Sequence, residues 1–188
     1  MNLSECLSRI EPQSAKWREA AREHIRTLTM PRWALGRLLD LAVDLAGITR
    51  RIDFPVARKK IVLMAGDHGV VAEKVSPQPQ CVTVQMLRNF SRGGGAIRVL
   101  AANAGADVRL VDLGVNADVR ELPGVIHRKI AFGTENMRRG PAMSRAQALA
   151  SVEAGIAVAE ELAPETDVFA TGEMGIGNTT PSSAILTV

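Results

Sequence analysis

Aromatic side chains are scarce: phenylalanine and tryptophan together make up 3% of the 188 residues, and tyrosine is absent. Proteins that bind single-stranded nucleic acid without sequence preference stack the bases on aromatic side chains. The net charge of +3 is also small, and its positive residues fall in short groups at 50–51, 58–60 and 138–139 that are typical of solvated surface. We therefore predict no nucleic-acid partner.

Cysteines and long apolar runs are also few. The two cysteines, Cys6 and Cys81, are too few for a disulfide framework or a zinc knuckle. No apolar run approaches the roughly 20 residues that a membrane-spanning helix needs. Charged residues interrupt the first eleven positions, so no signal-peptide core is present. These features predict a cytoplasmic protein without a membrane partner.

Apolar periodicity instead indicates alternating strands and helices. Strands are predicted at 61–65, 108–113, 125–131 and 167–170, and helices at 4–28, 34–48, 83–90, 96–104 and 144–162. Such alternation is typical of an α/β fold. We predict a Rossmann-like parallel sheet flanked by helices, with an N-terminal helical cap over residues 1–50 and a core over 58–188. The sequence stops inside an apolar run at 184–188, so we expect a truncated core.

A glycine-rich stretch at 171–181 follows the last predicted strand. Thr180 is expected to cap a helix that opens at Pro181, and glycines 172, 175 and 177 are expected to let the backbone approach a bound group. Free amides at a helix start favour a phosphate, and Glu173 supplies a carboxylate beside them. The pattern predicts a phosphorylated-sugar site, although it lacks the dinucleotide spacing and many similar turns bind nothing.

Two further groups are candidates for binding. Asp67 and His68 follow the first strand, and ligands on parallel sheets bind beyond the carboxyl ends of the strands. Both are metal-ligand types, but no third ligand lies at a suitable spacing. We expect Asp67 to fix the turn through backbone amides and His68 to line a pocket. A second group suits a flat heteroaromatic ligand, although a core methionine and a surface glutamine have the same pattern: Ser76, Pro77, Gln85 and Met86.

Four segments together resemble the nicotinate-nucleotide:dimethylbenzimidazole phosphoribosyltransferase family. They occur in the family's order and span nearly the whole chain: 64–70, 82–90, 140–144 and 172–181. The glycine loop within the last of them is specific to that family. The chain departs from the family at Arg32-Trp33-Ala34, where Pro-Gly-Ser is expected.

The resemblance implies an enzyme of cobalamin lower-ligand synthesis, without a cofactor. It implies transfer of phosphoribose from nicotinate mononucleotide to 5,6-dimethylbenzimidazole, which gives α-ribazole 5'-phosphate and nicotinate. It also implies a homodimer of chains about twice as long, whose catalytic glutamate base lies beyond Val188. Glu173 is then expected to contact the ribose or to steady its developing positive charge. The expected nucleotide contacts are Gly175, Gly177, Asn178 and Thr179, and the expected base pocket is Ser76, Pro77, Gln85 and Met86.

Two other functions remain open on the sequence. The chain can be a truncated nucleotide-binding module that lacks the catalytic base, and this fragment alone is expected to be inactive. It can also be a metal-dependent phosphohydrolase centred on Asp67 and His68.

Overall fold

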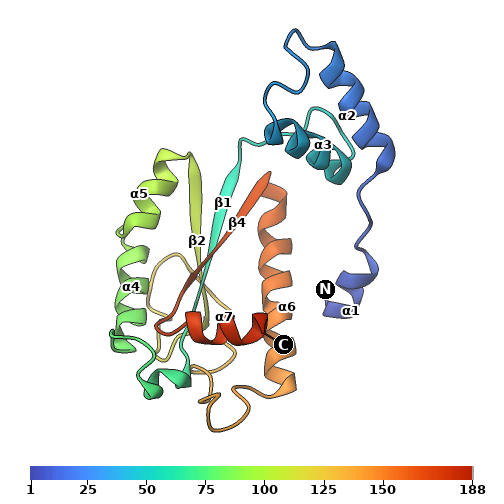
Figure 1. Cartoon of the computed structure of the whole chain (residues 1–188). Coiled ribbons are helices and arrows are strands. Elements are labelled where there is room, and N and C mark those ends of the chain that lie inside the picture. Colours follow the sequence, from blue (N-terminus) through green and yellow to red (C-terminus); the bar gives the residue numbers. More distant parts are fainter. Residues whose placement is uncertain (188) are drawn as a thin grey trace. The chain divides into compact units, whose positions relative to one another are not determined.

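From residue 57 onward, strands and helices alternate in the computed structural model, which describes residues 1–187 (Figure 1). The contacts divide the chain into two compact units. One comprises Ser4–Val56, and the other comprises Ala57–Val188 together with Met1–Leu3.

The larger unit contains a parallel sheet of four strands. They are β1 (Lys59–Gly66), β2 (Ala106–Gly114), β3 (Val125–His127) and β4 (Val168–Met174), in the order β3-β2-β1-β4. Every neighbouring pair is parallel. The predicted Rossmann-like α/β class is therefore confirmed, although β3 ends earlier and β4 ends later than the apolar runs indicated.

Helices cover both faces of this sheet. Between β1 and β2 come the 3-10 helix η1 (Gly69–Glu73), α4 (Cys81–Ser91) and α5 (Ala96–Asn103). Between β3 and β4 come α6 (Arg145–Leu162) and η2 (Ala163–Glu165), and α7 (Thr179–Leu186) follows β4. Figure 1 shows α4 and α5 on one side of the sheet and α6 on the other.

Two apolar clusters hold these layers together because alternate strand residues point to opposite faces. Leu63 and Leu110 pack with Leu87 and Phe90 of α4. On the other face, Val62 and Val111 pack with Val158 and Leu162 of α6. The connection that leaves β1 therefore crosses one face, and the connection that arrives at β4 crosses the opposite face.

The smaller unit is helical, but the single helix predicted over 4–28 is wrong. The structure has α1 (Leu3–Ser8) and α2 (Ala15–Thr27). Pro12 lies between them, and proline disfavours helical backbone at the residue before it and removes an N–H donor. Ser14 then starts α2, since its hydroxyl accepts a hydrogen bond from the Trp17 amide. The helix predicted at 34–48 is α3 (Arg37–Thr49).

α3 packs against α2 through one side only. Ala21 and Ile25 of α2 form a cluster with Leu39, Val43 and Ala46 of α3. A second apolar stripe on α3, formed by Leu38, Leu41 and Ile48, is more than half exposed. α3 therefore carries more apolar surface than α2 covers.

Candidate functional site

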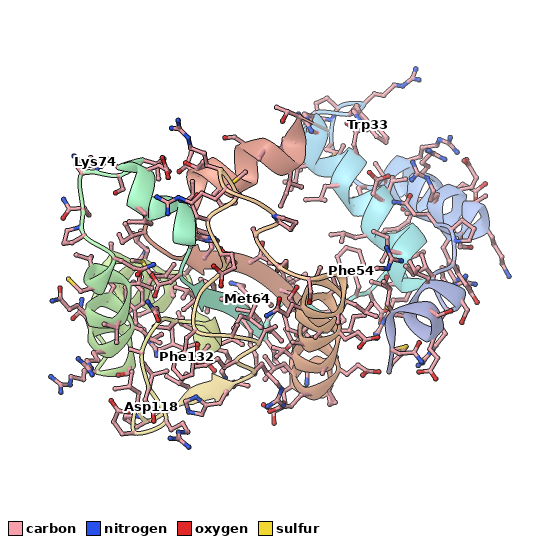
Figure 2. All side chains as sticks on the ribbon, turned by 90° about the horizontal axis from the view of Figure 1, so that it is seen from below. Trp33, Phe54, Met64, Lys74, Asp118 and Phe132 are labelled. Atoms are coloured by element: carbon pink, nitrogen blue, oxygen red, sulfur yellow. The ribbon has the colours of Figure 1, made fainter. Side chains whose placement is uncertain are left out.

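The site lies where the winding of the sheet reverses. β1 and β4 are neighbours, yet the helices that follow β1 and precede β4 lie on opposite faces. At such a reversal of an open parallel sheet, ligands bind in the crevice outside the carboxyl ends of the strands. Asp67 and His68 follow β1 at this point, and the 175–178 turn follows β4. Figure 2 views the molecule from this edge.

Glu173 belongs to β4 and not to the loop that the sequence predicted. The strand continues through Met174, so the predicted end at residue 170 is wrong. Glu173 lies opposite Met64 of β1 in the parallel register. Residues paired in this way point to the same face of a sheet, which here is the α6 face. Its side chain is exposed.

The helix after β4 begins two residues earlier than predicted. α7 starts at Thr179, its N-cap is Asn178, and no side chain caps it. The Asn178 amide already donates to the Gly175 carbonyl at 3.1 Å, so the turn closes before Thr180 is reached. The predicted capping role of Thr180 and the first-position role of Pro181 are therefore wrong.

Two of the three glycines are required by packing against the end of β1 and its following segment. A Cβ on Gly175 would clash with the Gly66 carbonyl oxygen and with Asn178 Oδ1. Gly177 has a φ of +85°, and a Cβ there would lie 2.9 Å from Val71. A Cβ on Gly172 would meet only ordinary contacts. Packing therefore does not explain Gly172, and its expected close approach to a bound group remains a prediction.

Several amides of the turn are already engaged. The Ile176 amide donates to Thr83 Oγ1 at 3.0 Å, and the Thr180 amide donates to the Gly177 carbonyl at 3.1 Å. Thr83 is fully buried in the first turn of α4. It therefore fastens the turn to α4, a role that sequence reasoning missed because the two segments lie 93 residues apart.

Asp67 acts as a buried anchor between three segments. Its carboxylate Oδ2 accepts a hydrogen bond from the Asn116 amide at 2.8 Å, its own amide donates to the Gly114 carbonyl, and its carbonyl accepts from the Thr134 amide. Its Oδ1 is buried and has no hydrogen-bond partner among the described residues. Asp67 does fix the strand end through a backbone amide, as predicted, but the amide comes from the loop after β2.

His68 joins β1 to both neighbouring helix starts. Its Nε2 lies in hydrogen-bond contact with Asn178 Oδ1, and its carbonyl accepts from Gln80 Nε2 at 3.3 Å. Gln80 Oε1 accepts in turn from Asn116 Nδ2 at 3.2 Å. The roles of Gln80 and Asn116 were missed by sequence reasoning, because amide residues outside strands and helices carry no periodic signal.

The loop between β3 and α6 lies over the same strand ends. Thr134 bonds to Asp67, and Asn136 Nδ2 donates to Glu73 Oε1 at 2.8 Å. Arg138 forms an ion pair with Glu73 at 3.2 Å. The loop is thereby fixed to η1.

A cavity of about 470 Å³ opens between this loop, the strand ends and α6, a volume typical of small-molecule sites. Met64 and Phe132, both labelled in Figure 2, are among its lining residues. Three predicted site residues also line it: Asp67, His68 and Asn178. Glu173 is not a lining residue, but it shares the α6 face with Met64.

The predicted base pocket is separate from this cavity. Met86 packs against the apolar core, while Gln85 is exposed on α4. Pro77 is exposed, and the Ser76 hydroxyl accepts from the Gln78 amide at 3.1 Å. Gly177 lies against Val75, so the segment that precedes Ser76 adjoins the turn. The roles proposed for these residues remain predictions.

Within residues 1–187, no three histidine, cysteine or carboxylate side chains lie close enough together to hold a metal ion. None of the helices in that range combines the length and apolar character of a bilayer-crossing segment.

Residues 10–188 match the model of a protein family described as Phosphoribosyltransferase. The chain belongs to this family. Its relatives include the nicotinate-nucleotide–dimethylbenzimidazole phosphoribosyltransferase of Syntrophotalea carbinolica, which is 54% identical over 183 residues, covering 96% of this chain and 52% of the relative. The enzyme of the same name from Desulfotalea psychrophila is 51% identical, with 99% and 53% covered.

A solved structure gives the same result at the level of the fold. The crystal structure of nicotinate-nucleotide-dimethylbenzimidazole phosphoribosyltransferase from Thermus thermophilus superimposes with a TM-score of 0.84 at 41% identity. The match covers 89% of this chain and 51% of that one. The chain thus spans about half the length of the relatives that it matches, and the resemblance found in its sequence is confirmed.

Proposed function

We propose that the protein containing this chain transfers phosphoribose from nicotinate mononucleotide to 5,6-dimethylbenzimidazole. The products would be α-ribazole 5'-phosphate and nicotinate, in cobalamin lower-ligand synthesis. The observation that carries the proposal is the match of the whole site region to relatives named for this nucleotide and this base, at up to 54% identity. A cavity beside the reversal point of the sheet suits a small-molecule reaction.

In the proposed reaction, the departure of nicotinate needs little help from protein side chains. The bond between the nicotinate nitrogen and the anomeric carbon breaks, and its electron pair neutralises the pyridinium ring. A nitrogen of the benzimidazole attacks the opposite face of that carbon, which inverts it, and the proton on the other nitrogen passes to a carboxylate base. We expect that base in the part of the protein beyond Val188. Because the substrate is a monophosphate with no diphosphate to leave, the reaction does not call for magnesium.

We assign Glu173 to the ribose side of this reaction. Its exposed carboxylate lies next to the end of β1 and shares a face with the cavity-lining Met64. From there it can contact the ribose or stabilise the positive charge that develops on it. We assign the nucleotide to Gly175, Gly177, Asn178 and Thr179, and the acceptor base to Ser76, Pro77, Gln85 and Met86.

We also propose that the protein acts as a cytoplasmic homodimer. The exposed stripe of Leu38, Leu41 and Ile48 on α3 supports the dimer, since exposed apolar surface of this kind is typical of interaction sites.

The experiment is to incubate the full-length protein with nicotinate mononucleotide and a panel of azole and phenolic bases. We expect nicotinate to be released in step with a ribosylated benzimidazole, measured by liquid chromatography. Release of nicotinate without a base adduct would contradict the transfer and indicate hydrolysis. Binding of the nucleotide with no release under any base would instead support the non-catalytic module.

A further inference from the structure

The side chain of Asn178 is used in an unusual way. Asparagine is among the preferred N-cap residues, because its side-chain oxygen accepts from an amide of the next helical turn. Asn178 occupies the N-cap of α7 but caps nothing, and its backbone is itself helical, with φ −49° and ψ −36°. Its Oδ1 contacts His68 Nε2 at the end of the neighbouring strand.

The turn is shaped to permit this contact. Asn178 Oδ1 passes so close to Gly175 that a Cβ there would clash with it. The same Cβ would clash with the Gly66 carbonyl oxygen, two residues before His68. Because Gly175 has no Cβ, the side-chain amide of Asn178 has room to reach the end of β1.

We propose that His68 is a positioning residue, which holds Asn178 and thereby fixes the 175–179 turn in the arrangement that binds the phosphoribose. The inference rests on the proposed function for the identity of the ligand. The site would recognise a sugar phosphate, and His68 would act on it through Asn178 and without contact to the reacting atoms.

The contact with Asn178 determines which ring nitrogen of His68 carries a hydrogen. An amide oxygen only accepts hydrogen bonds, so Nε2 must carry the hydrogen and donate to Asn178 Oδ1. Both the neutral Nε2–H tautomer and the protonated ring meet that requirement. The neutral tautomer with its hydrogen on Nδ1 does not.

Removal of the imidazole isolates this link. The bond from Gln80 Nε2 reaches the His68 carbonyl, and the contacts of Asp67 involve its own carboxylate and backbone. His68→Ala therefore leaves those connections in place and removes the tie to Asn178 together with the part of the cavity wall that the imidazole forms. His68→Gln restores a donor, since its carboxamide NH2 can reach the same oxygen.

The first test compares His68→Ala, His68→Gln and the control His24→Ala in the full-length protein. His24 is an exposed residue of α2. Misplacement of a bound group by about 1 Å can cost on the order of a hundredfold, so we expect His68→Ala to raise the KM for nicotinate mononucleotide by roughly ten- to a hundredfold. We expect kcat to change less, the melting temperature to stay near that of the wild type, and His68→Gln to recover most of the loss.

Two results would overturn the proposal. One is an unchanged KM in His68→Ala. The other is a loss in His68→Gln as large as in His68→Ala, with His24→Ala normal, since a restored donor would then have no effect.

The second test does not depend on the ligand. In protein labelled with nitrogen-15 at histidine, we expect the His68 ring signals of an Nε2–H form, identified by their loss in His68→Gln. An Nδ1–H tautomer would overturn the assignment. We also expect faster amide exchange over residues 175–180 in His68→Ala, restored in His68→Gln. If the wild type fails to bind nicotinate mononucleotide, the proposed function fails, while these two measurements still decide whether His68 positions the turn.

Discussion

Gly69 shows how closely the loop after β3 approaches the end of β1. A Cβ on Gly69 would lie 2.6 Å from the Asn136 nitrogen and from the Glu135 carbonyl carbon. Both are backbone atoms, so the loop itself would have to move. We expect Gly69→Ala to lower the free energy of unfolding by about 1–3 kcal/mol, measured by urea denaturation. Gly140→Ala in the same loop is the control, because a Cβ there meets nothing within 4 Å, and equal losses in both variants would contradict the prediction.

Glu173 is exposed on β4, so its carboxylate can be altered without disturbing the core. If it stabilises charge on the ribose, Glu173→Gln should lower kcat by on the order of a hundredfold and leave the melting temperature unchanged. Steady-state release of nicotinate measures the effect, with the exposed Glu121→Gln as a control. Unchanged turnover together with unchanged substrate binding would show that Glu173 has no part in the reaction.

Single residues were predictable where their role is local. Asp67 follows an apolar strand, and that position alone indicates an anchor for the strand end, which the structure bears out. Its partner, the Asn116 amide, comes from a loop 49 residues later, and no local pattern identifies it. Thr180 was expected to cap α7 because its residue type suits a cap, but the carbonyl of Gly175 had already closed the turn.

Elements with two independent signals were predicted well. Ser144 and Gln147 form a capping box, as their spacing indicates, and α6 starts directly after Ser144. β4 was predicted too short because its apolar run stops at Ala170. The strand continues through Thr171 and Glu173, which are exposed polar residues on the α6 face, and pairing with β1 rather than apolar character keeps them extended. Periodicity in the sequence does not report such pairing.

The start of β4 is tied to the start of β1 by an ion pair that should respond to acid. Arg58 Nη2 lies 2.6 Å from Asp167 Oδ1, and the Arg58 amide donates to Oδ2 at 2.8 Å. The hydrogen bonds and charge of Arg58 hold the pKa of Asp167 below its usual value. A carboxyl group whose pKa is lower in the folded state stabilises the folded protein at any pH above its unfolded pKa of about 4. This stabilisation is lost as the pH falls through the pKa that the group has in the folded state.

We therefore expect acid to weaken the wild type more than Asp167→Asn. Between about pH 5 and pH 2, the free energy of unfolding of the wild type should fall more steeply than that of the variant. Urea denaturation at a series of pH values measures both slopes. Identical slopes would show that the pair does not couple proton binding to folding.

At the scale of the whole molecule, the reversal of the sheet brings the candidate residues together. His68 and Asn178 are 110 residues apart, yet they are in contact because β1 and β4 are neighbours. The sequence predicted a parallel sheet but not its strand order, since alternation of strands and helices is compatible with several orders. The rule that ligands bind beyond the carboxyl ends of the strands already indicates one rim for His68 and the loop after β4. The β1–β4 pairing, which comes only from the tertiary structure, makes them neighbours on that rim.

The same strand order leaves β4 with a single neighbour among residues 1–187. Its Val168 and Phe169 side chains are 40% and 41% exposed. An exposed apolar edge strand is a template for pairing with another chain. We expect the 188-residue chain alone to self-associate as its concentration rises, measured by sedimentation velocity.

A charge on the edge should suppress this association. Lysine on edge strands is a common protection against pairing, so Phe169→Lys should shift the chain toward the monomer. Val99→Lys on α5 is the control. Val99 is 68% exposed, but a helix presents no row of free backbone N–H and C=O groups with which another strand could pair. A wild-type chain that stays monodisperse and melts cooperatively would contradict the role given to the β4 edge, and equal effects of the two lysines would assign the association to apolar surface in general.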